Sequence, residues 1–208
     1  MDELDKVAQG AEQAFDLAEY AKTVRACRSY RRFDEGEPIP EALLVALVDL
    51  ARTTASGANR QPLRYRIVNS SAECARVFPK LRWAAALKDW DGPVAGEHPT
   101  GYIVICDAGR GARTSVDEGI AAQTILLGAT QAGFGGCMLH AFDKHGVADE
   151  LGFDADAAKP LMVVALGRPV EDVRLEPASA SPDGTLAYWR DAAGVHHVPK
   201  RSLENVLL

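Results

Sequence analysis

The sequence predicts an α+β domain with a central sheet, because apolar patterns typical of strands and of helices alternate along most of the chain. The compact apolar runs at 102–106 and 161–166 are typical of buried strands. Residues 40–53 carry the wide apolar stripe of a buried helix. A chain of 208 residues, 47% of them hydrophobic, can bury one sizeable core. The long irregular C-terminal part departs from a plain alternation of strands and helices.

Capping and turn signals set the order of the expected elements. Pro40 suits the first position of a helix, and Gly133 is a natural helix end. Ser115 and Glu118 have the spacing of a capping box. In chain order, the expected elements are helices at 12–26 and 40–53, a loop at 55–62, a strand at 64–68, a helix at 71–81, a strand at 102–106, a helix from 115 to 133, a strand at 136–139, a helix at 144–151, a strand at 161–166, a hairpin around Gly194 and a short helix from 202.

Charge and composition exclude several classes of protein. The net charge of −6 argues against a nucleic-acid partner or an anionic membrane surface. No apolar run has the length of a membrane span, and the N-terminus lacks the apolar core of a signal peptide, so the expected location is the cytoplasm. The four cysteines are scattered without a Cys-x-x-Cys pair, and no metal site is predicted. Cys106 and Cys137 lie in apolar runs, where buried free thiols are expected.

The first candidate binding segment runs from Arg28 to Arg32. Its three guanidinium groups and its serine hydroxyl suit a phosphate or another planar acceptor. In an extended conformation, Arg28, Tyr30 and Arg32 would share one side, with Ser29 and Arg31 on the other. Taken alone, the spacing favours a solvated basic surface or a helix end.

Two further segments contain glycine and amide side chains. In the loop at 55–62, Asn59 and Gln61 can donate and accept hydrogen bonds at the rim of a ligand. Taken alone, this segment is better explained as an ordinary loop closed by Asx turns and a proline. The glycines between 133 and 136 do not have dinucleotide-binding spacing, because Met138 stands where a third glycine is needed. They are expected to end a helix and to let the backbone pass closely into a strand.

Three histidines near these segments have modest expected roles. A lone histidine such as His140 at a strand end is rarely a base or a metal ligand. Adjacent residues of a strand face opposite sides, so His196 and His197 cannot easily hold one ion, and a structural or surface role is expected for both. The neighbouring Lys200 and Arg201 could meet a phosphate together with Arg28.

Taken in order, these segments resemble the nitroreductase family of FMN-dependent oxidoreductases. Residues 28–33 are similar to its Arg-Ser-x-Arg-x-Phe segment, and 55–62 to its Ser-x-x-Asn-x-Gln-Pro loop. Residues 166–169 resemble a strand end of the family, and 199–201 its terminal phosphate-binding stretch. The long helix resembles the central dimer helix of the family at four positions, Asp117, Gly119, Ala121 and Gln123. The resemblance covers nearly the whole chain from about residue 25.

The resemblance implies a homodimer with a three-layer α/β/α fold and a central mixed, mainly antiparallel sheet. It also implies a division into an N-terminal lead-in and helix at 1–24 and one domain at 25–208, with a lid region at 83–100. In that lid, Trp90 would face the substrate, or else anchor the core or an interface. FMN would be the cofactor, bound by twelve residues, Arg28, Ser29, Arg31, Ser56, Asn59, Gln61, Met138, Leu139, His140, Ala141, Lys200 and Arg201.

The implied roles of these residues follow the parts of FMN. Arg28 and Ser29 would hold the phosphate, completed by the pair at 200–201, and Arg31 would approach the N1/O2 edge of the ring. The backbone at 138–141 would line the ring, and the loop residues Ser56, Asn59 and Gln61 would come from the partner subunit. Two positions depart from the family. Cys27 replaces a second basic residue, and Leu63 replaces a tryptophan.

The implied reaction is ping-pong. NAD(P)H would pass hydride to flavin N5, and a small planar acceptor such as a nitroaromatic or a quinone would then take it from the same ring face. The protein would supply orientation and electrostatics without a catalytic side chain. One alternative is a relative that binds or cleaves flavin without general reductase turnover. A nucleic-acid-binding regulator that uses the arginine segment is the other.

Overall fold

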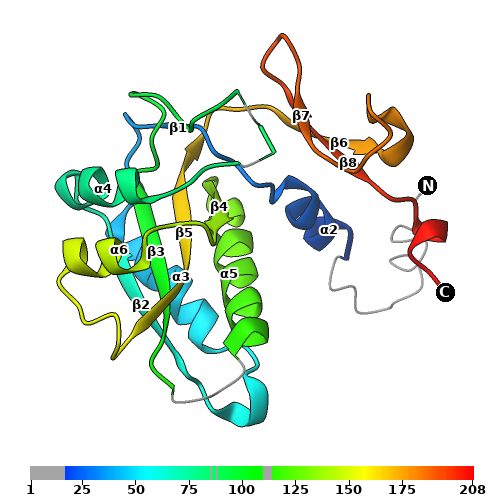
Figure 1. Ribbon diagram of the computed structural model, residues 1–208. Coiled ribbons are helices and arrows are strands. Elements are labelled where there is room, and N and C mark those ends of the chain that lie inside the picture. The colour runs from blue at the N-terminus through cyan, green and yellow to red at the C-terminus, as the bar shows by residue number, and fades with distance from the viewer. Residues whose placement is uncertain (1–16, 85, 88, 110–113) are drawn as a thin grey trace.

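The computed structural model describes residues 17–84, 86–87, 89–109 and 114–208, arranged around a five-stranded sheet (Figure 1). The strand order is β1-β5-β3-β2, and β4 also pairs with β5. The sheet consists of β1 (Phe33–Asp34), β2 (Leu63–Val68), β3 (Gly101–Asp107), β4 (Gly135–Leu139) and β5 (Lys159–Pro169). All pairs of these strands are antiparallel. The mainly antiparallel sheet expected from the resemblance is therefore confirmed, and its parallel component is the isolated bridge between Ser29 and Gly136.

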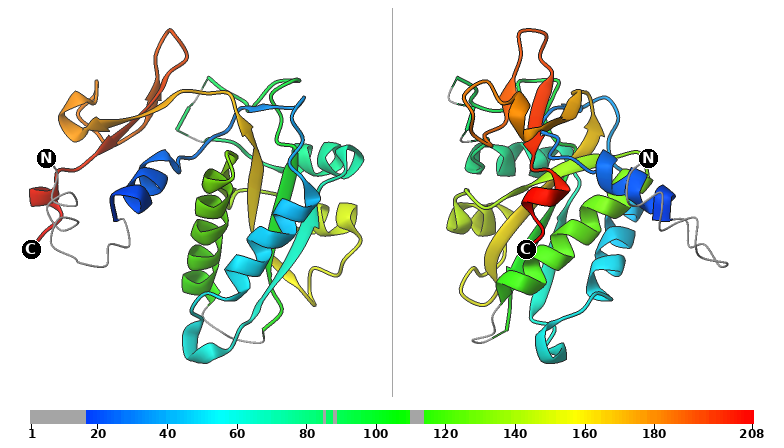
Figure 2. Two further views of the ribbon diagram at one scale, coloured as in Figure 1. Left: turned by 180° about the vertical axis from the view of Figure 1, so that it is seen from behind. Right: turned by 90° about the vertical axis from the view of Figure 1, so that its right-hand side faces the viewer.

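Helices cover both faces of this sheet, which gives the expected three layers (Figures 1 and 2). On one face, α3 (Glu41–Arg52) and α5 (Thr114–Gln131) pack against each other and against Ile103 and Ile105 of β3. On the other, α4 (Ser71–Val77) and α6 (Lys144–Leu151) cover Tyr102 and Val104. Because alternate residues of a strand face opposite sides, the continuous apolar run of β3 fills two separate cores.

Helix α2 (Leu17–Ala26) and a small second sheet near the C-terminus lie beside this three-layer body. Helix α2 contacts α5, and the second sheet has the order β6-β8-β7. It contains β6 (Val173–Pro177), β7 (Trp189–Arg190) and β8 (His196–Lys200), with β6 parallel and β7 antiparallel to β8. Figure 1 shows α2 and this small sheet on the same side of the molecule. The hairpin of β7 and β8 around Gly194 was expected, whereas the sequence pattern missed β1 and β6.

Helix boundaries differ from the sequence expectation where a local group intervenes. Pro40 is the N-cap residue of α3 rather than its first helical residue, since its backbone is extended with ψ 136°. The helix expected over 71–81 ends at Val77, where a 3₁₀ turn containing Pro79 follows, because proline cannot donate an α-helical hydrogen bond. Ser115 lies inside α5, so the expected capping box is wrong. The expected first turns at 12–16 lie outside the described residues.

The end of α5 agrees with the expectation. Gly133 has φ 79°, the left-handed conformation that often ends an α-helix. The N–H of Phe134 then donates to the carbonyl of Ala129 at 2.8 Å, which satisfies one of the free carbonyls at the end of α5. The chain then enters β4 directly. Among the described residues, no helix is both long and apolar enough to cross a bilayer.

Candidate functional site

The segment that follows α2 makes a tight turn at the edge of the central sheet. Ser29 forms a parallel bridge with Gly136, and the N–H of Tyr30 donates to the carbonyls of both Gly136 and Arg28, each at 3.0 Å. The bond from Tyr30 back to Arg28 closes a three-residue turn. This turn breaks the alternation expected of an extended segment, so Arg28, Ser29 and Arg31 line one cavity together. The sequence expectation that Arg28 and Arg31 face opposite sides is therefore wrong.

Two glycines of β4 allow this close approach. A Cβ at Gly136 would lie 2.0 Å from the carbonyl oxygen of Ala165, and one at Gly135 would lie 2.6 Å from the ring of Tyr30. Either side chain would displace its neighbour. The glycines thus have the role expected from the sequence, a close backbone passage into a strand.

The terminal strand β8 supplies the opposite wall of the cavity. His196, Val198 and Lys200 occupy alternate positions of β8 and line the cavity together, as side chains on one face of a strand do. His197 faces the other way. Its ring stacks on Trp189 with ring centroids 5.0 Å apart, and its Nδ1 lies 2.8 Å from Glu176 Oε1. The expected opposite orientation of the two histidines is confirmed.

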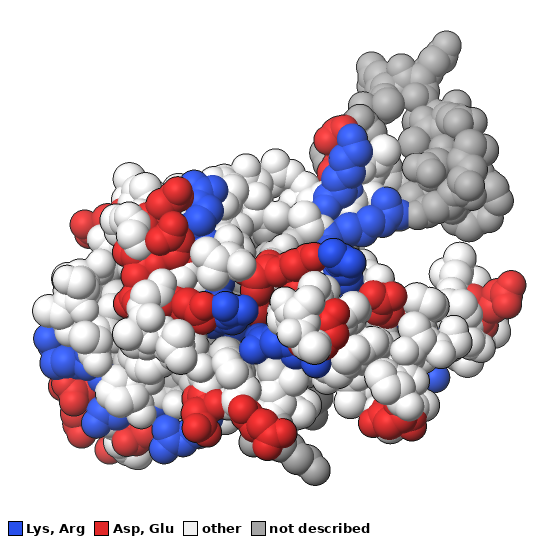
Figure 3. Space-filling model, turned by 90° about the horizontal axis from the view of Figure 1, so that it is seen from above, with Lys and Arg blue, Asp and Glu red and all other residues white. Residues whose placement is uncertain are grey.

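The resulting cavity has a volume of about 310 Å³, within the roughly 300–1,000 Å³ typical of ligand pockets. It is lined by Cys27, Arg28, Ser29, Arg31, Gln123, Leu126, Met138, Tyr188, His196, Val198 and Lys200. The lining contains three cationic side chains and no carboxylate. The face shown in Figure 3 carries Lys, Arg, Asp and Glu side by side, and the chain as a whole has a net charge of −6. The positive charge of this cavity is therefore a local feature of an acidic protein.

Contacts with the protein hold the two arginines of the cavity in place, and Nε of Arg28 remains an unused donor among the described residues. Arg28 donates from Nη2 to the carbonyl of Val24 at 2.7 Å, while its Nε is buried without a hydrogen-bond partner among the described residues. Arg31 lies with its guanidinium carbon 5.1 Å from the centre of the Tyr188 ring, a cation–π arrangement. A buried donor of a charged group without a partner is costly, so an acceptor at Nε of Arg28 would be stabilising.

A buried carboxylate lies beside the cavity. The side chain of Glu171 is 1% exposed, accepts a hydrogen bond from the backbone N–H of Arg31, and pairs with Arg190 Nη2 at 3.1 Å. It therefore anchors both the arginine segment and β7. The nearby His196 is buried beside Arg31 and Arg190, and burial, followed by these two positive charges, lowers its pKa to about 4.

The last arginine of the basic segment has a different partner. Arg32 forms a bidentate pair with Glu97, with Nε donating to Oε2 at 2.7 Å and Nη2 donating to Oε1. This hydrogen bonding lowers the pKa of Glu97. Arg32 therefore fixes the stretch around Glu97 rather than lining the cavity.

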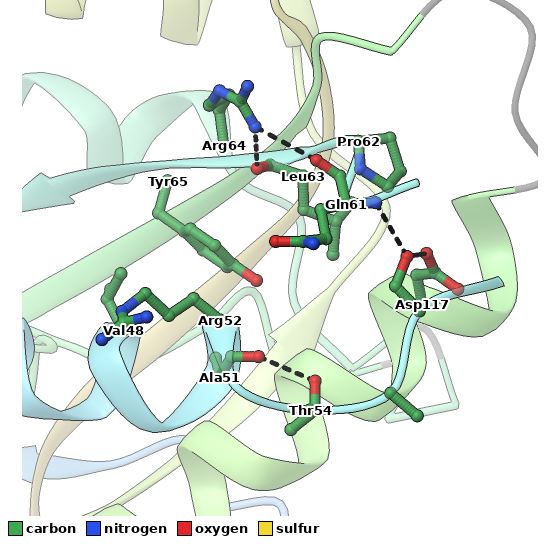
Figure 4. Close-up of a pocket in the computed structure, with 12 residues that line it drawn as sticks. Val48, Ala51, Arg52, Thr54, Gln61, Pro62, Leu63, Arg64, Tyr65 and Asp117 are labelled. Carbon is green, nitrogen blue, oxygen red and sulfur yellow. Dashed lines mark hydrogen bonds between the residues drawn. The ribbon is translucent and has the colours of Figure 1, made fainter. Parts of the chain in front are cut away.

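The loop residues Ser56 and Gln61 line a second cavity, between α3, β2 and the loop (Figure 4). Ser56 Oγ donates to Asp117 Oδ2 at 2.6 Å and accepts from the N–H of Gln61 at 3.0 Å. Gln61 Nε2 donates to Asn59 Oδ1 at 2.9 Å. Three residues, Ala58, Asn59 and Gln61, adopt positive φ values of 51°, 53° and 47°. Within one chain, this ordered loop does not share the cavity of Arg28.

The structure places the other expected site residues as follows. Met138 lines the first cavity, whereas Leu139 is buried and the carbonyl of Ala141 accepts from the N–H of Arg82 at 2.9 Å. His140 is 65% exposed, with Nδ1 3.4 Å from Glu118 Oε1. Arg201 is exposed outside the cavity lining.

Trp90 lines a third cavity of about 540 Å³, where the guanidinium carbon of Arg190 lies 4.8 Å from the centre of its ring. Tyr188 lines both this cavity and the first one.

Sequence reasoning missed several residues at the first cavity. The period-two pattern of β8 could have placed His196 and Val198 on the face of Lys200. By contrast, nothing in the local sequence marks Tyr188, and Gln123 was expected only on the dimer helix, because each reaches the cavity through long-range packing. Among the described residues, no group of three or more His, Cys, Asp or Glu side chains could hold a metal ion.

Comparison with known proteins defines the class. A model of the nitroreductase family matches residues 24–168, which is more than half of the chain. The chain therefore belongs to the nitroreductase family, as the ordered motifs predicted. No curated protein sequence matches it.

Solved structures of nitroreductases share the fold. A candidate NAD(P)H:FMN oxidoreductase from Staphylococcus epidermidis is 15% identical with a TM-score of 0.64, and the match covers 96% of this chain and 99% of that one. An FMN-dependent nitroreductase from Clostridium difficile is 16% identical with a TM-score of 0.59, over 77% and 93%. A nitroreductase family protein from Clostridium novyi is 21% identical with a TM-score of 0.58, over 72% and 86%.

Proposed function

We propose that this chain is an FMN-dependent oxidoreductase that takes hydride from NAD(P)H and delivers it to a small planar acceptor. The observation that carries the proposal is the cavity in which Arg28, Ser29, Arg31 and Lys200 converge. Family membership supports the same conclusion, and two solved structures with this fold are described as an NAD(P)H:FMN oxidoreductase and an FMN-dependent nitroreductase.

The residues of the cavity fit a phosphorylated, partly apolar ligand. The Nε of Arg28 is buried without a partner among the described residues, so an anionic oxygen would satisfy it. Leu126, Met138 and Val198 offer an apolar surface beside the cations. A cavity with these two kinds of wall suits a ligand with a phosphate at one end and a planar ring at the other.

Each wall has a proposed task. Arg28, Ser29 and Lys200 would hold the phosphate. Arg31 would place positive charge at the N1/O2 edge of the ring, where it favours negative charge. The backbone at 138–141 would lie against the ring. Bound FMN supplies the hydride chemistry at N5, and the protein residues bind it, orient it and exclude water. Lys200 supplies a cation that Cys27 does not, and its position in the cavity supports this division.

We further propose that the active unit is a homodimer. Val116, Gly119, Ile120 and Gln123 recur at helical spacing on α5, and Val116 is 65% exposed. Gln123 belongs to this face and also lines the cavity. The ordered loop with Ser56, Asn59 and Gln61 would then complete the site of the partner subunit.

The remaining expectations become proposals of the same kind. Residues 25–208 would act as one domain, with 83–100 as a lid whose Trp90 faces the acceptor. The position of Trp90 in a cavity that shares Tyr188 with the first one supports this role. The cytoplasm is the proposed location.

The test is flavin binding followed by reduction. Purified protein incubated with FMN should retain it, and NAD(P)H should bleach the bound flavin until a nitroaromatic or a quinone restores the spectrum. Arg28→Ala with Lys200→Ala should lose most FMN retention, whereas His140→Ala, whose side chain is exposed, should keep it. Protein that stays colourless would refute the proposal. Flavin that is bound but never reduced, or that is degraded, would identify the alternative without reductase turnover.

A further inference from the structure

His196 is an unexpected polar residue in the wall of the cavity. Its side chain lies on the same face of β8 as Val198 and Lys200, and the residue is 1% exposed. The sequence predicted only a structural or surface role for it. A buried imidazole in a ligand cavity can act as a donor, an acceptor or a cation, and its neighbours decide which.

Arg31 determines which ring nitrogen of His196 carries the lone pair. Its Nη1 lies 3.5 Å from Nε2 of His196, and a guanidinium group can only donate. Nε2 must therefore present its lone pair, which assigns the single proton of the neutral ring to Nδ1. The cationic form is disfavoured, first because the ring is buried and then because of the positive charges of Arg31 and Arg190.

This assignment leaves a buried donor without an acceptor. Nδ1 of His196 has no hydrogen-bond partner among the described residues. The ring of Tyr188 lies next to it, with centroids 5.0 Å apart, and offers a face rather than an acceptor. Buried donors of this kind are rare in proteins unless a ligand or an ordered water satisfies them.

The spacing along β8 indicates which part of a ligand this donor would meet. His196 lies four residues before Lys200, a separation of roughly 13 Å along a strand. Lys200 and Arg28 are the proposed phosphate ligands, so His196 lies toward the other end of the cavity, beside Arg31. A donor there suits a ring oxygen or ring nitrogen rather than the phosphate.

We infer that His196, through Nδ1–H, donates a hydrogen bond to the ring end of bound FMN while Nε2 holds the guanidinium of Arg31 in place. The inference rests on the proposed function, because it assumes that this cavity holds FMN. His196 would thus bind the cofactor directly and also position Arg31.

Comparison of FMN with riboflavin tests the inference, because riboflavin lacks the phosphate. His196→Phe removes both ring nitrogens and keeps an aromatic ring against Tyr188. Titration of the full-length apoprotein should show both flavins binding about two- to twelve-fold more weakly, the equivalent of one neutral hydrogen bond. The ratio of the two affinities should not change. Lys200→Ala should instead weaken FMN much more than riboflavin.

Two isosteric variants separate the roles of the ring nitrogens. His196→Asn can place a donor at the position of Nδ1, and His196→Gln can place an acceptor at the position of Nε2. Asn should therefore retain more flavin affinity than Gln. His197→Phe, on the opposite face of β8, is the matched control and should bind both flavins as the wild type does.

The outcomes distinguish this inference from the proposed function. Wild-type protein that binds neither flavin refutes the proposed function itself. If the wild type binds both, the inference fails when His196→Phe binds them equally well, when only FMN is weakened, or when Gln retains affinity better than Asn. Thermal unfolding of each apoprotein shows whether the variant folds. If Nδ1 of His196 serves the ligand, its loss should lower flavin affinity without lowering the unfolding temperature of the apoprotein.

Discussion

The pKa of His196 makes the stability of the folded chain depend on pH in a defined window. Its pKa is lowered from 6.5 to about 4 in the folded protein, mainly by burial and then by the charge of Arg31. Above pH 6.5 the ring is neutral in both the folded and the unfolded chain, so it makes no difference to stability. Between pH 6.5 and 4 the unfolded chain binds the proton more readily. Stability is therefore lost as pH falls, by about 2 kcal/mol at pH 5 and about 3 kcal/mol at pH 4.

His196→Gln isolates this contribution, because glutamine does not titrate. Urea unfolding of the wild type and the variant, at one protein concentration and at pH 7.5, 6.5 and 5.0, gives the difference in free energy of unfolding. Hydrogen bonds to Glu176 and Asp191 raise the pKa of the neighbouring His197, so His197 stabilises the folded chain as pH falls. This contribution is the same in the wild type and the variant, and it cancels in the difference between them. The wild type should lose about 2 kcal/mol more than the variant between pH 7.5 and 5. If the free energy of unfolding changes with pH by the same amount in the wild type and the variant, burial does not lower the pKa of His196.

Two further substitutions test the packing beside the cavity. Gly136→Ala places a Cβ 2.0 Å from the carbonyl oxygen of Ala165, and should destabilise toward the upper end of the about 1–3 kcal/mol that overpacking costs, measured by urea unfolding. Glu171→Gln leaves Arg190 without its buried counter-charge and should cost up to about 3–5 kcal/mol. Glu97→Gln is the control, because the Arg32–Glu97 pair is more exposed, with side chains 29% and 23% exposed, and should lose less stability. An equal loss of unfolding free energy in the two variants would contradict the claim that burial makes the Glu171–Arg190 pair costly to break.

The sequence predicted many of the individual helices and strands well because they depend on local patterns, whereas the three layers were expected only from the family resemblance. Helix α6 and most of β3 and β5 follow from apolar periodicity, and the end of α5 follows from Gly133. The two-residue strand β1 carries too little pattern to be recognised. Strand β6 is also invisible, because its parallel pairing with β8 depends on contacts far along the chain.

The candidate site was only partly predictable for the same reason. The positive residues could be named from the basic segment and from Lys200. Their orientation depends on the turn that Tyr30 makes with Arg28, and no alternation rule shows it. Arg32 and Arg201 looked equivalent to their neighbours, yet one pairs with Glu97 and the other lies outside the cavity lining. The local sequence shows which charged residues are present, but which of them line the cavity depends on tertiary contacts.

The face of α5 connects the cavity with the proposed dimer. Along α5, Gly119 comes after Asp117, which accepts a hydrogen bond from Ser56 of the loop, and before Gln123, which lines the cavity. A Cβ at Gly119 would meet nothing within 4 Å in a single chain. Gly119→Arg should therefore fold as an isolated chain, since the space around the position is open and arginine has a higher helix propensity than glycine.

At a dimer interface the same arginine would introduce an unpaired charge against the partner. Gly119→Arg should therefore elute as a monomer in size-exclusion chromatography with light scattering, and should lose FMN because the loop at Ser56 would no longer complete a site. Gly119→Ala adds one methyl group and should remain a dimer. If Gly119→Arg remains a flavin-loaded dimer, this face of α5 is not the interface. If the wild type binds flavin as a monomer, each site is complete within one chain and the loop at Ser56 has another role.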